Sequence, residues 1–118
     1  MLATGTRARR LPFGKELDGI VELRTLEDAR KLRAAIASNP RVVVVGAGFI
    51  GMEVAASCRK KGLEVTVVEP LPAPLIRGLG SVLGERVART HRDEGVVFRL
   101  GAGVDGFEGE GSVTGVRL

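Results

Sequence analysis

The sequence of 118 residues has one cysteine, one histidine, no tryptophan, no tyrosine and four phenylalanines. A single cysteine, Cys58, excludes a disulfide-stabilised scaffold, and with His91 it cannot supply the four ligands of a structural zinc site. With so few aromatic rings, the platforms that stack on single-stranded nucleic acid are missing. We therefore expect no metal and no nucleic-acid partner, although the net charge is +4.

Long hydrophobic runs are absent as well. No apolar stretch approaches the ~18–20 residues that cross a bilayer, and residues 1–12 contain no apolar core of the signal-peptide type. The sequence thus predicts a cytoplasmic protein without membrane association. Because 44% of the residues are hydrophobic, the chain can bury a core, and its length suits one compact domain.

The middle of the chain has the pattern of a strand–helix–strand unit. Four consecutive valines at 42–45 are typical of a strand covered on both faces of a parallel sheet. The run ends in Gly46-Ala47-Gly48-Phe49-Ile50-Gly51, after which a helical pattern extends to Gly62. Residues 64–69 have the pattern of a second strand, so residues 41–69 match a βαβ unit.

The flanking segments predict further elements of an α/β fold. A helix is expected to begin after the N-cap Thr25 and to be stopped by Ser38-Asn39-Pro40. A second helix is expected over 81–94, with an apolar stripe of Leu79, Leu83 and Val87. Residues 96–100 predict a third strand and residues 104–118 a β-hairpin. The fold class is therefore α/β, a Rossmann-like three-layer unit with a parallel sheet plus an antiparallel β-hairpin.

The glycines between the first strand and its helix indicate a phosphate-binding turn. Gly46 allows the tight turn, Gly48 lets a pyrophosphate approach the backbone, and Gly51 lets the helix pack closely on the strand. The helix N-terminus offers free N–H groups and a partial positive charge to the phosphates. The alternative is a tight turn whose glycines serve packing alone.

Glu69 closes the second strand, 18 residues after Gly51, where an acid can accept hydrogen bonds from both ribose hydroxyls. Its carboxylate would repel a 2′-phosphate, and no basic residue follows it in Pro70-Leu71-Pro72-Ala73. We therefore expect NADH to be preferred over NADPH. The alternative for Glu69 is a solvated acid at a strand end. His91 is expected to be a solvated helix residue and Cys58 a small buried hydrophobe.

Three segments together carry a resemblance to a known family. LATGTRARRLP, ELRTLEDARKLR and VVVVGAGFIGMEVAASCRKKGLEVTVVEPLPAPLIR, in this order, resemble an FAD-dependent pyridine nucleotide–disulfide oxidoreductase. The chain is most similar to NADH-dependent ferredoxin or rubredoxin reductases. The resemblance implies that hydride passes from NADH to FAD and that electrons pass on to a ferredoxin-like or rubredoxin-like acceptor.

The resemblance also implies roles for individual residues. The flavin would be touched by Ala3, Thr4 and Gly5. The pyrophosphate of NAD would be held by Gly46, Gly48 and Gly51, and the nucleotide would be lined by Phe49 and Ile50. Glu69 would hold the adenosine ribose, Arg77 would lie near the adenosine end, and Glu53 would lie near the nicotinamide. From the residues alone, Glu53 is also explained as an acid that complements the helix dipole, and Arg77 as a surface residue.

By this resemblance residues 1–19 are the tail of the FAD-binding domain and a linker, and residues 20–118 are an NAD-binding domain truncated at its C-terminal end. Such a fragment is expected to be inactive by itself, and its uncapped sheet edge would allow a homo-oligomer. The basic residues Arg7, Arg9 and Arg10 would help to dock an acidic redox partner. A stand-alone nucleotide-sensing module and a methyltransferase that uses S-adenosylmethionine are the alternatives.

Overall fold

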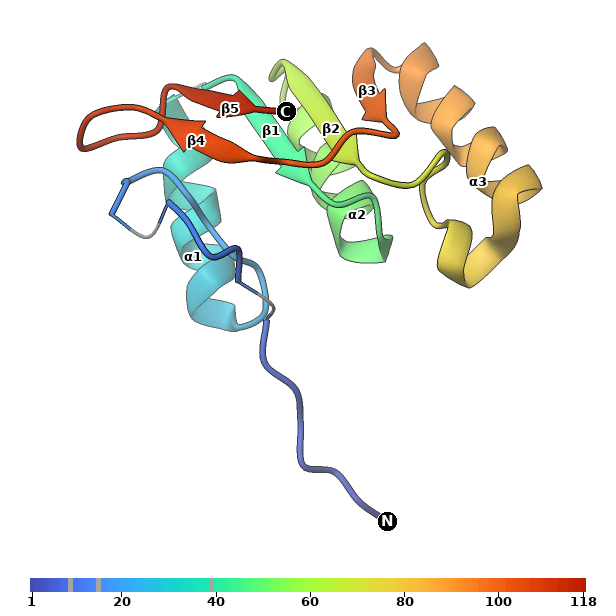
Figure 1. Ribbon diagram of the computed structural model, residues 1–118, viewed down its shortest axis with the longest axis horizontal. Helices are drawn as coiled ribbons and strands as arrows, with labels where there is room; N and C mark the ends of the chain where they lie inside the picture. Colours follow the sequence, from blue (N-terminus) through green and yellow to red (C-terminus); the bar gives the residue numbers. More distant parts are fainter. Residues whose placement is uncertain (9, 15, 39) are drawn as a thin grey trace.

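The computed structural model describes residues 1–8, 10–14, 16–38 and 40–118 (Figure 1). In chain order the elements are α1 (Leu26–Ala35), a 3₁₀ turn η1 (Ile36–Ser38), β1 (Val42–Val45), α2 (Phe49–Lys60), β2 (Val65–Glu69), α3 (Ile76–Asp93), β3 (Val96–Leu100), β4 (Gly106–Glu108) and β5 (Gly115–Arg117). β1, β2 and β3 form a parallel sheet in that order, and β4 and β5 pair antiparallel. The predicted α/β fold, with its parallel sheet and hairpin, is confirmed.

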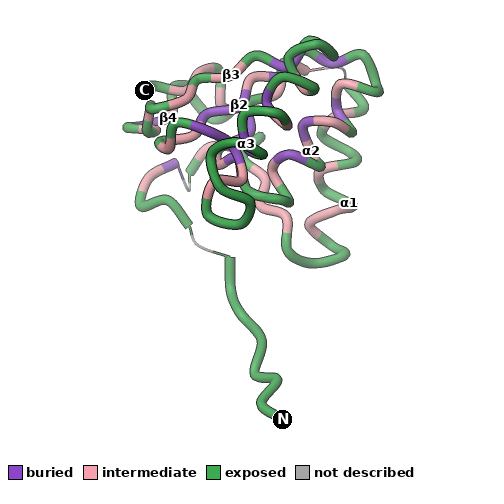
Figure 2. Tube along the Cα trace, turned by 90° about the vertical axis from the view of Figure 1, so that its right-hand side faces the viewer, coloured by how far each residue is buried: buried purple, intermediate pink, exposed green. Residues whose placement is uncertain are grey.

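The core lies between the parallel sheet and helix α2. The strand register aligns Val44 with Val67 and Phe98, and Val65 with Val96, so these side chains share one face of the sheet. They pack with three buried residues of α2, which are Met52, Ala55 and Cys58. Figures 1 and 2 show the helices on one side of the sheet and the β4–β5 hairpin on the other.

The valine run of β1 is covered on one face only, so the expectation of a strand covered on both faces is wrong. Val44 is buried, whereas Val43 and Val45 are 42% and 45% exposed on the opposite face. Val97 of β3 lies on that same open face and is 49% exposed. The cause is that β1 is an edge strand of the described sheet and the short hairpin covers only part of this face.

Helix α1 begins where the sequence predicts. Thr25 is its N-cap: the Thr25 hydroxyl accepts from the Asp28 amide at 3.2 Å, and the Asp28 carboxylate accepts from the Thr25 amide at 2.8 Å. This reciprocal capping box satisfies backbone donors that have no partner within the helix. α1 ends at Ala35 and η1 follows, just before the predicted stop at 38–40, of which Asn39 lies outside the described residues.

Helix α3 begins earlier than predicted. It starts at Ile76, and a break at Gly80, whose φ is 78°, separates this first turn from the rest of the helix, which coincides with the predicted 81–94 to within one residue. The predicted apolar stripe is wrong for Leu79 and Leu83, which are 39% and 52% exposed, whereas Val87 packs against the core as expected. Gly84 and Ala88 are buried instead. A Cβ at Gly84 would collide with the carbonyl oxygen of Pro74, so the helix approaches the preceding loop through its small residues.

Phe13 and Asp18 contact the hairpin. The Asp18 amide donates to the Gly111 carbonyl and the Asp18 carbonyl accepts from the Val113 amide, both at 2.8 Å. The rings of Phe13 and Phe107 meet edge to face with their centres 5.5 Å apart. Residues 1–8 by contrast extend away from the domain (Figure 1). Among the described helices, none combines the length and the apolar character that a membrane span requires.

Candidate nucleotide-binding site

The turn between β1 and α2 has the conformation that its three glycines predict. Gly46 has a φ of 97°, a backbone conformation that favours glycine, and its amide donates to the Val68 carbonyl at 2.8 Å. A Cβ at Gly51 would collide with the Gly46 carbonyl oxygen, so only glycine lets α2 lie this close to β1. The strand thus runs directly into the helix, and the helix N-terminus opens at the end of the sheet.

Gly48 leaves open space in front of the helix. It is the N-cap of α2, it has no side chain to cap the helix, and a Cβ built there would meet no other atom within 4 Å. The Met52 amide donates to the Gly48 carbonyl at 3.0 Å, and the amides that precede Met52 at a helix start have no partner one turn back. The free amide donors, the partial positive charge of the helix N-terminus and the open space at Gly48 suit an anion such as a pyrophosphate.

Glu69 joins the end of β2 to the glycine turn. Its carboxylate oxygen Oε2 accepts from the Ala47 amide at 2.7 Å, and Oε1 accepts from the Leu71 amide at 3.0 Å. Each carboxylate oxygen has a second acceptor site, so both can still accept from a ligand hydroxyl. The contact with Ala47 was missed by the sequence reasoning, because the glycine pattern alone does not indicate which amide of the turn faces the strand end.

The segment after β2 returns to the same edge of the sheet. The Leu75 amide donates to the Ala47 carbonyl at 2.8 Å, which brings the first turn of α3 beside the glycine turn. The amides of Gly101 and Ala102, just after β3, donate to the carbonyls of Leu71 and Glu69 at 3.2 and 3.3 Å. The turns that follow all three parallel strands therefore meet at one edge, which is where open α/β sheets bind ligands.

The structure brings most of the predicted site residues together, but not all of them. Gly46, Gly48, Phe49, Gly51 and Glu69 lie at this edge, and Arg77 is exposed in the adjoining first turn of α3. Thr4 and Gly5 lie apart, in the extended N-terminal segment, where a Cβ at Gly5 would meet nothing within 4 Å (Figure 1).

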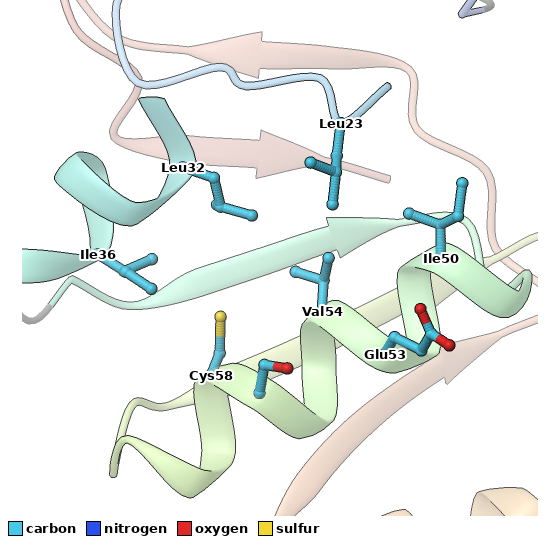
Figure 3. Close-up of a pocket in the computed structure, with 8 residues that line it drawn as sticks. Leu23, Leu32, Ile36, Ile50, Glu53, Val54 and Cys58 are labelled. Atoms are coloured by element: carbon cyan, nitrogen blue, oxygen red, sulfur yellow. The ribbon is translucent and has the colours of Figure 1, made fainter. Parts of the chain in front are cut away.

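Ile50 and Glu53 face a different feature, an open groove between α1 and α2 (Figure 3). The groove has a volume of about 220 Å³ and is mainly aliphatic, with Glu53 and Ser57 at its side; the remaining lining residues are Leu23, Leu32, Ile36, Ile50, Val54 and Cys58. Cys58 is 1% exposed, as expected for a small buried hydrophobe, and burial raises the pKa of its thiol.

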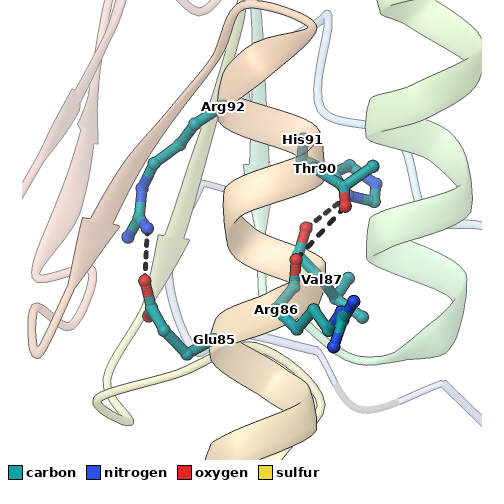
Figure 4. A network of polar contacts seen from close by, with 6 residues as sticks. All are labelled: Glu85, Arg86, Val87, Thr90, His91 and Arg92. Atoms are coloured by element: carbon teal, nitrogen blue, oxygen red, sulfur yellow. Dashed lines mark hydrogen bonds and ion pairs between the residues drawn. The ribbon is translucent and has the colours of Figure 1, made fainter.

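His91 is not the solvated helix residue that the sequence suggested. It is half-buried, with Nδ1 3.0 Å from the Val87 carbonyl oxygen (Figure 4). Its Nε2 lies 3.4 Å from the Met52 carbonyl oxygen. The second contact joins α3 to α2. At the neighbouring position Arg92 pairs with Glu85 of the same helix at 2.7 Å, so of these polar contacts only the one between His91 and Met52 joins two helices.

Across residues 1–8, 10–14, 16–38 and 40–118, no three His, Cys, Asp or Glu side chains are grouped in a way that could hold a metal ion. Of the basic residues near the N-terminus, Arg10 pairs with Glu22 at 2.8 Å, and Arg9 lies outside the described residues.

A parallel sheet with a glycine turn after its first strand and an acid at the end of its second defines a Rossmann-type α/β domain. The whole chain, residues 1–118, matches the pyridine nucleotide-disulphide oxidoreductase family, and the chain belongs to this family. The match favours the oxidoreductase interpretation over a nucleotide sensor or a methyltransferase.

Similar proteins support the same assignment. Rhodocoxin reductase of Rhodococcus erythropolis is 50% identical over 105 residues, which are 88% of this chain and 25% of that protein. The ferredoxin–NAD(+) reductase subunit of the benzene 1,2-dioxygenase system of Pseudomonas putida is 43% identical over 119 residues, covering 100% of this chain and 29% of that protein. The crystal structure of the ferredoxin reductase for the CYP199A2 system from Rhodopseudomonas palustris superposes with a TM-score of 0.91 at 39% identity, covering 97% of this chain and 29% of that one. The chain thus spans less than a third of the length of these relatives.

Proposed function

We propose that this chain is the NADH-binding part of a flavin-dependent oxidoreductase that passes hydride from NADH to FAD and electrons to a ferredoxin-like or rubredoxin-like acceptor. The observation that carries the proposal is the bond between the Glu69 carboxylate and the Ala47 amide, which holds a ribose-binding acid beside a phosphate-binding turn. Two of the similar proteins are ferredoxin reductases, and the name of one of them includes NAD(+).

The residues at this edge fit a dinucleotide. The open approach at Gly48 and the uncapped start of α2 suit a pyrophosphate, and the remaining acceptor sites of Glu69 suit ribose hydroxyls. Phe49 offers an exposed apolar ring beside them. Bound NADH supplies the hydride, while the part of this chain is to bind the dinucleotide and fix its orientation.

We assign the remaining roles by the family resemblance. Arg77 would lie near the adenosine end of the dinucleotide, Ile50 would line the nucleotide, and Glu53 would lie near the nicotinamide. Thr4 and Gly5 would contact FAD. In the same interpretation residues 1–19 are the end of an FAD-binding domain and a linker, and residues 20–118 are an NAD-binding domain.

Replacing Glu69 by glutamine tests the proposal. The variant keeps the size of the side chain but removes its charge and one of its two acceptor oxygens. We expect NADH binding to weaken by about tenfold, which is the value of one hydrogen bond to a charged group. NADPH binding should weaken less, or strengthen, because the repulsion of the 2′-phosphate is removed.

Isothermal titration calorimetry with both nucleotides measures these changes, and Glu64→Gln is the matched control. Glu64 is an exposed acid just before β2, at the opposite end of that strand from Glu69. The control should bind NADH as the unchanged chain does. Tighter binding of NADPH than NADH by the unchanged chain, or equal NADH affinity in the Glu69→Gln variant, would contradict the proposal.

A further inference from the structure

Gly78, in the first turn of α3, lies directly against the ring of Phe49. A Cβ built on Gly78 would lie 2.9 Å from Cε2 and 3.2 Å from Cζ of that ring, closer than ordinary van der Waals contact allows. Phe49 is the first residue of α2, immediately after the open position at Gly48, and its side chain is 59% exposed. The ring therefore has Gly78 on one side and solvent at the mouth of the candidate site on the other.

The backbone around Gly78 is fixed to the glycine turn. The Leu75 carbonyl accepts from the amides of Gly78 and Leu79 at 2.9 and 2.8 Å, while the Leu75 amide donates to the Ala47 carbonyl. Gly78 is not among the glycines with positive φ, so its backbone conformation is open to any residue. Glycine weakens a helix relative to alanine. Space for the Phe49 ring is thus the feature of this position that requires a glycine.

We infer that Gly78 is a positioning residue for the dinucleotide: its missing side chain seats the Phe49 ring at the mouth of the site, where the bound nucleotide packs against it. This inference rests on the proposed function and adds a residue that lies outside the glycine motif. Contact between an exposed aromatic ring and a flat ligand ring strengthens binding, and the contribution to affinity is largest when the orientation of the ring is fixed before the ligand binds.

Gly78→Ala tests the inference without unfolding the chain. The added methyl group meets the far end of a side chain, so the ring of Phe49 moves rather than the backbone. We expect NADH affinity to fall by about two- to tenfold, the range of one aromatic contact. Phe49→Ala should have a similar effect, and adding Gly78→Ala to Phe49→Ala should change the affinity no further. Ser81→Ala, an exposed change in the same helix, is the control.

Two measurements separate the possible outcomes. NADH fluorescence follows nucleotide binding, and thermal melting without nucleotide measures how the contact between residue 78 and the Phe49 ring affects stability. Gly78→Ala should raise the melting temperature more in the Phe49→Ala background than in the unchanged chain. If the two substitutions weaken binding additively, or if neither alters NADH affinity while Glu69→Gln does, the inference is wrong and the proposed function stands. If the unchanged chain binds no NADH, the proposed function fails, and this inference fails with it.

Discussion

Two glycines of one turn, three residues apart, should lose different properties when each is replaced by alanine: stability at Gly51 and NADH affinity at Gly48. Gly51→Ala places a Cβ against the Gly46 carbonyl oxygen and within 3.3 Å of a Val44 side-chain carbon. That carbonyl cannot rotate away, because the Ala47 amide in the same peptide plane donates to the Glu69 carboxylate. Such overpacking costs about 1–3 kcal/mol, and a collision with fixed backbone lies in the upper part of that range, at about 2–3 kcal/mol; the better helix propensity of alanine offsets about 1 kcal/mol of it.

The net loss for Gly51→Ala is therefore about 1–2 kcal/mol, which corresponds to a melting temperature lower by about 5–10 °C for a domain of this size. Gly48→Ala adds the same methyl group to open space at an ordinary φ of −78°, so its effect on stability is that of a slightly poorer N-cap, below about 1 kcal/mol. The same methyl group narrows the approach of a pyrophosphate, so this variant should lose NADH affinity instead.

Differential scanning calorimetry and NADH titration of the two variants provide the assay. The expected pattern is a lower melting temperature for Gly51→Ala and weaker NADH binding at nearly unchanged stability for Gly48→Ala. A Gly51→Ala chain as stable as the original would show that α2 is not seated on β1 through this glycine. Unchanged NADH affinity in Gly48→Ala would show that the phosphates do not approach this position.

The remaining predictions concern one helix cap and one thiol. Backbone and side-chain hydrogen bonds with Thr25 lower the pKa of Asp28 below its ordinary value of 3.8, so the capping box stabilises α1 above about pH 4 and is lost as the pH falls through the lowered pKa. The Thr25 amide resonance should follow this titration by NMR, and Asp28→Asn should abolish it; a midpoint at or above 3.8 would contradict the cap. Because Cys58 is buried and its thiol pKa is raised, a thiol reagent should label it quickly only in denaturant. Labelling of the folded chain as fast as free cysteine would refute that burial.

The features predicted well from the sequence are those fixed by local backbone chemistry. The glycine turn, the Thr25 cap and the positions of the parallel strands along the chain each depend on residues close together in the sequence. Gly46 illustrates the reason, since a positive φ is required there whatever lies around the turn. The sequence therefore indicated both the fold class and the centre of the candidate site.

The features predicted poorly depend on contacts between distant segments. Leu83 is apolar and has the spacing of a buried helical stripe, but it is exposed. Gly84 is buried in its place, because a residue without a side chain lets α3 approach Pro74. Val43 is as apolar as Val44, but it lies on the face of the sheet that the helices do not cover and is therefore exposed. His91 contacts a carbonyl 39 positions away, which no local pattern reveals.

The bond between Ala47 and Glu69 joins residues only 22 positions apart, and the intervening chain is one helix with the strand that follows it. Closing a short segment costs less chain entropy than closing a long one, and contacts of low sequence separation favour rapid folding. We therefore expect the acid and the glycine turn to meet early during folding, before the hairpin pairs with residues near the N-terminus. The nucleotide-binding edge of the sheet would then form first, and the rest of the domain would pack around it afterwards.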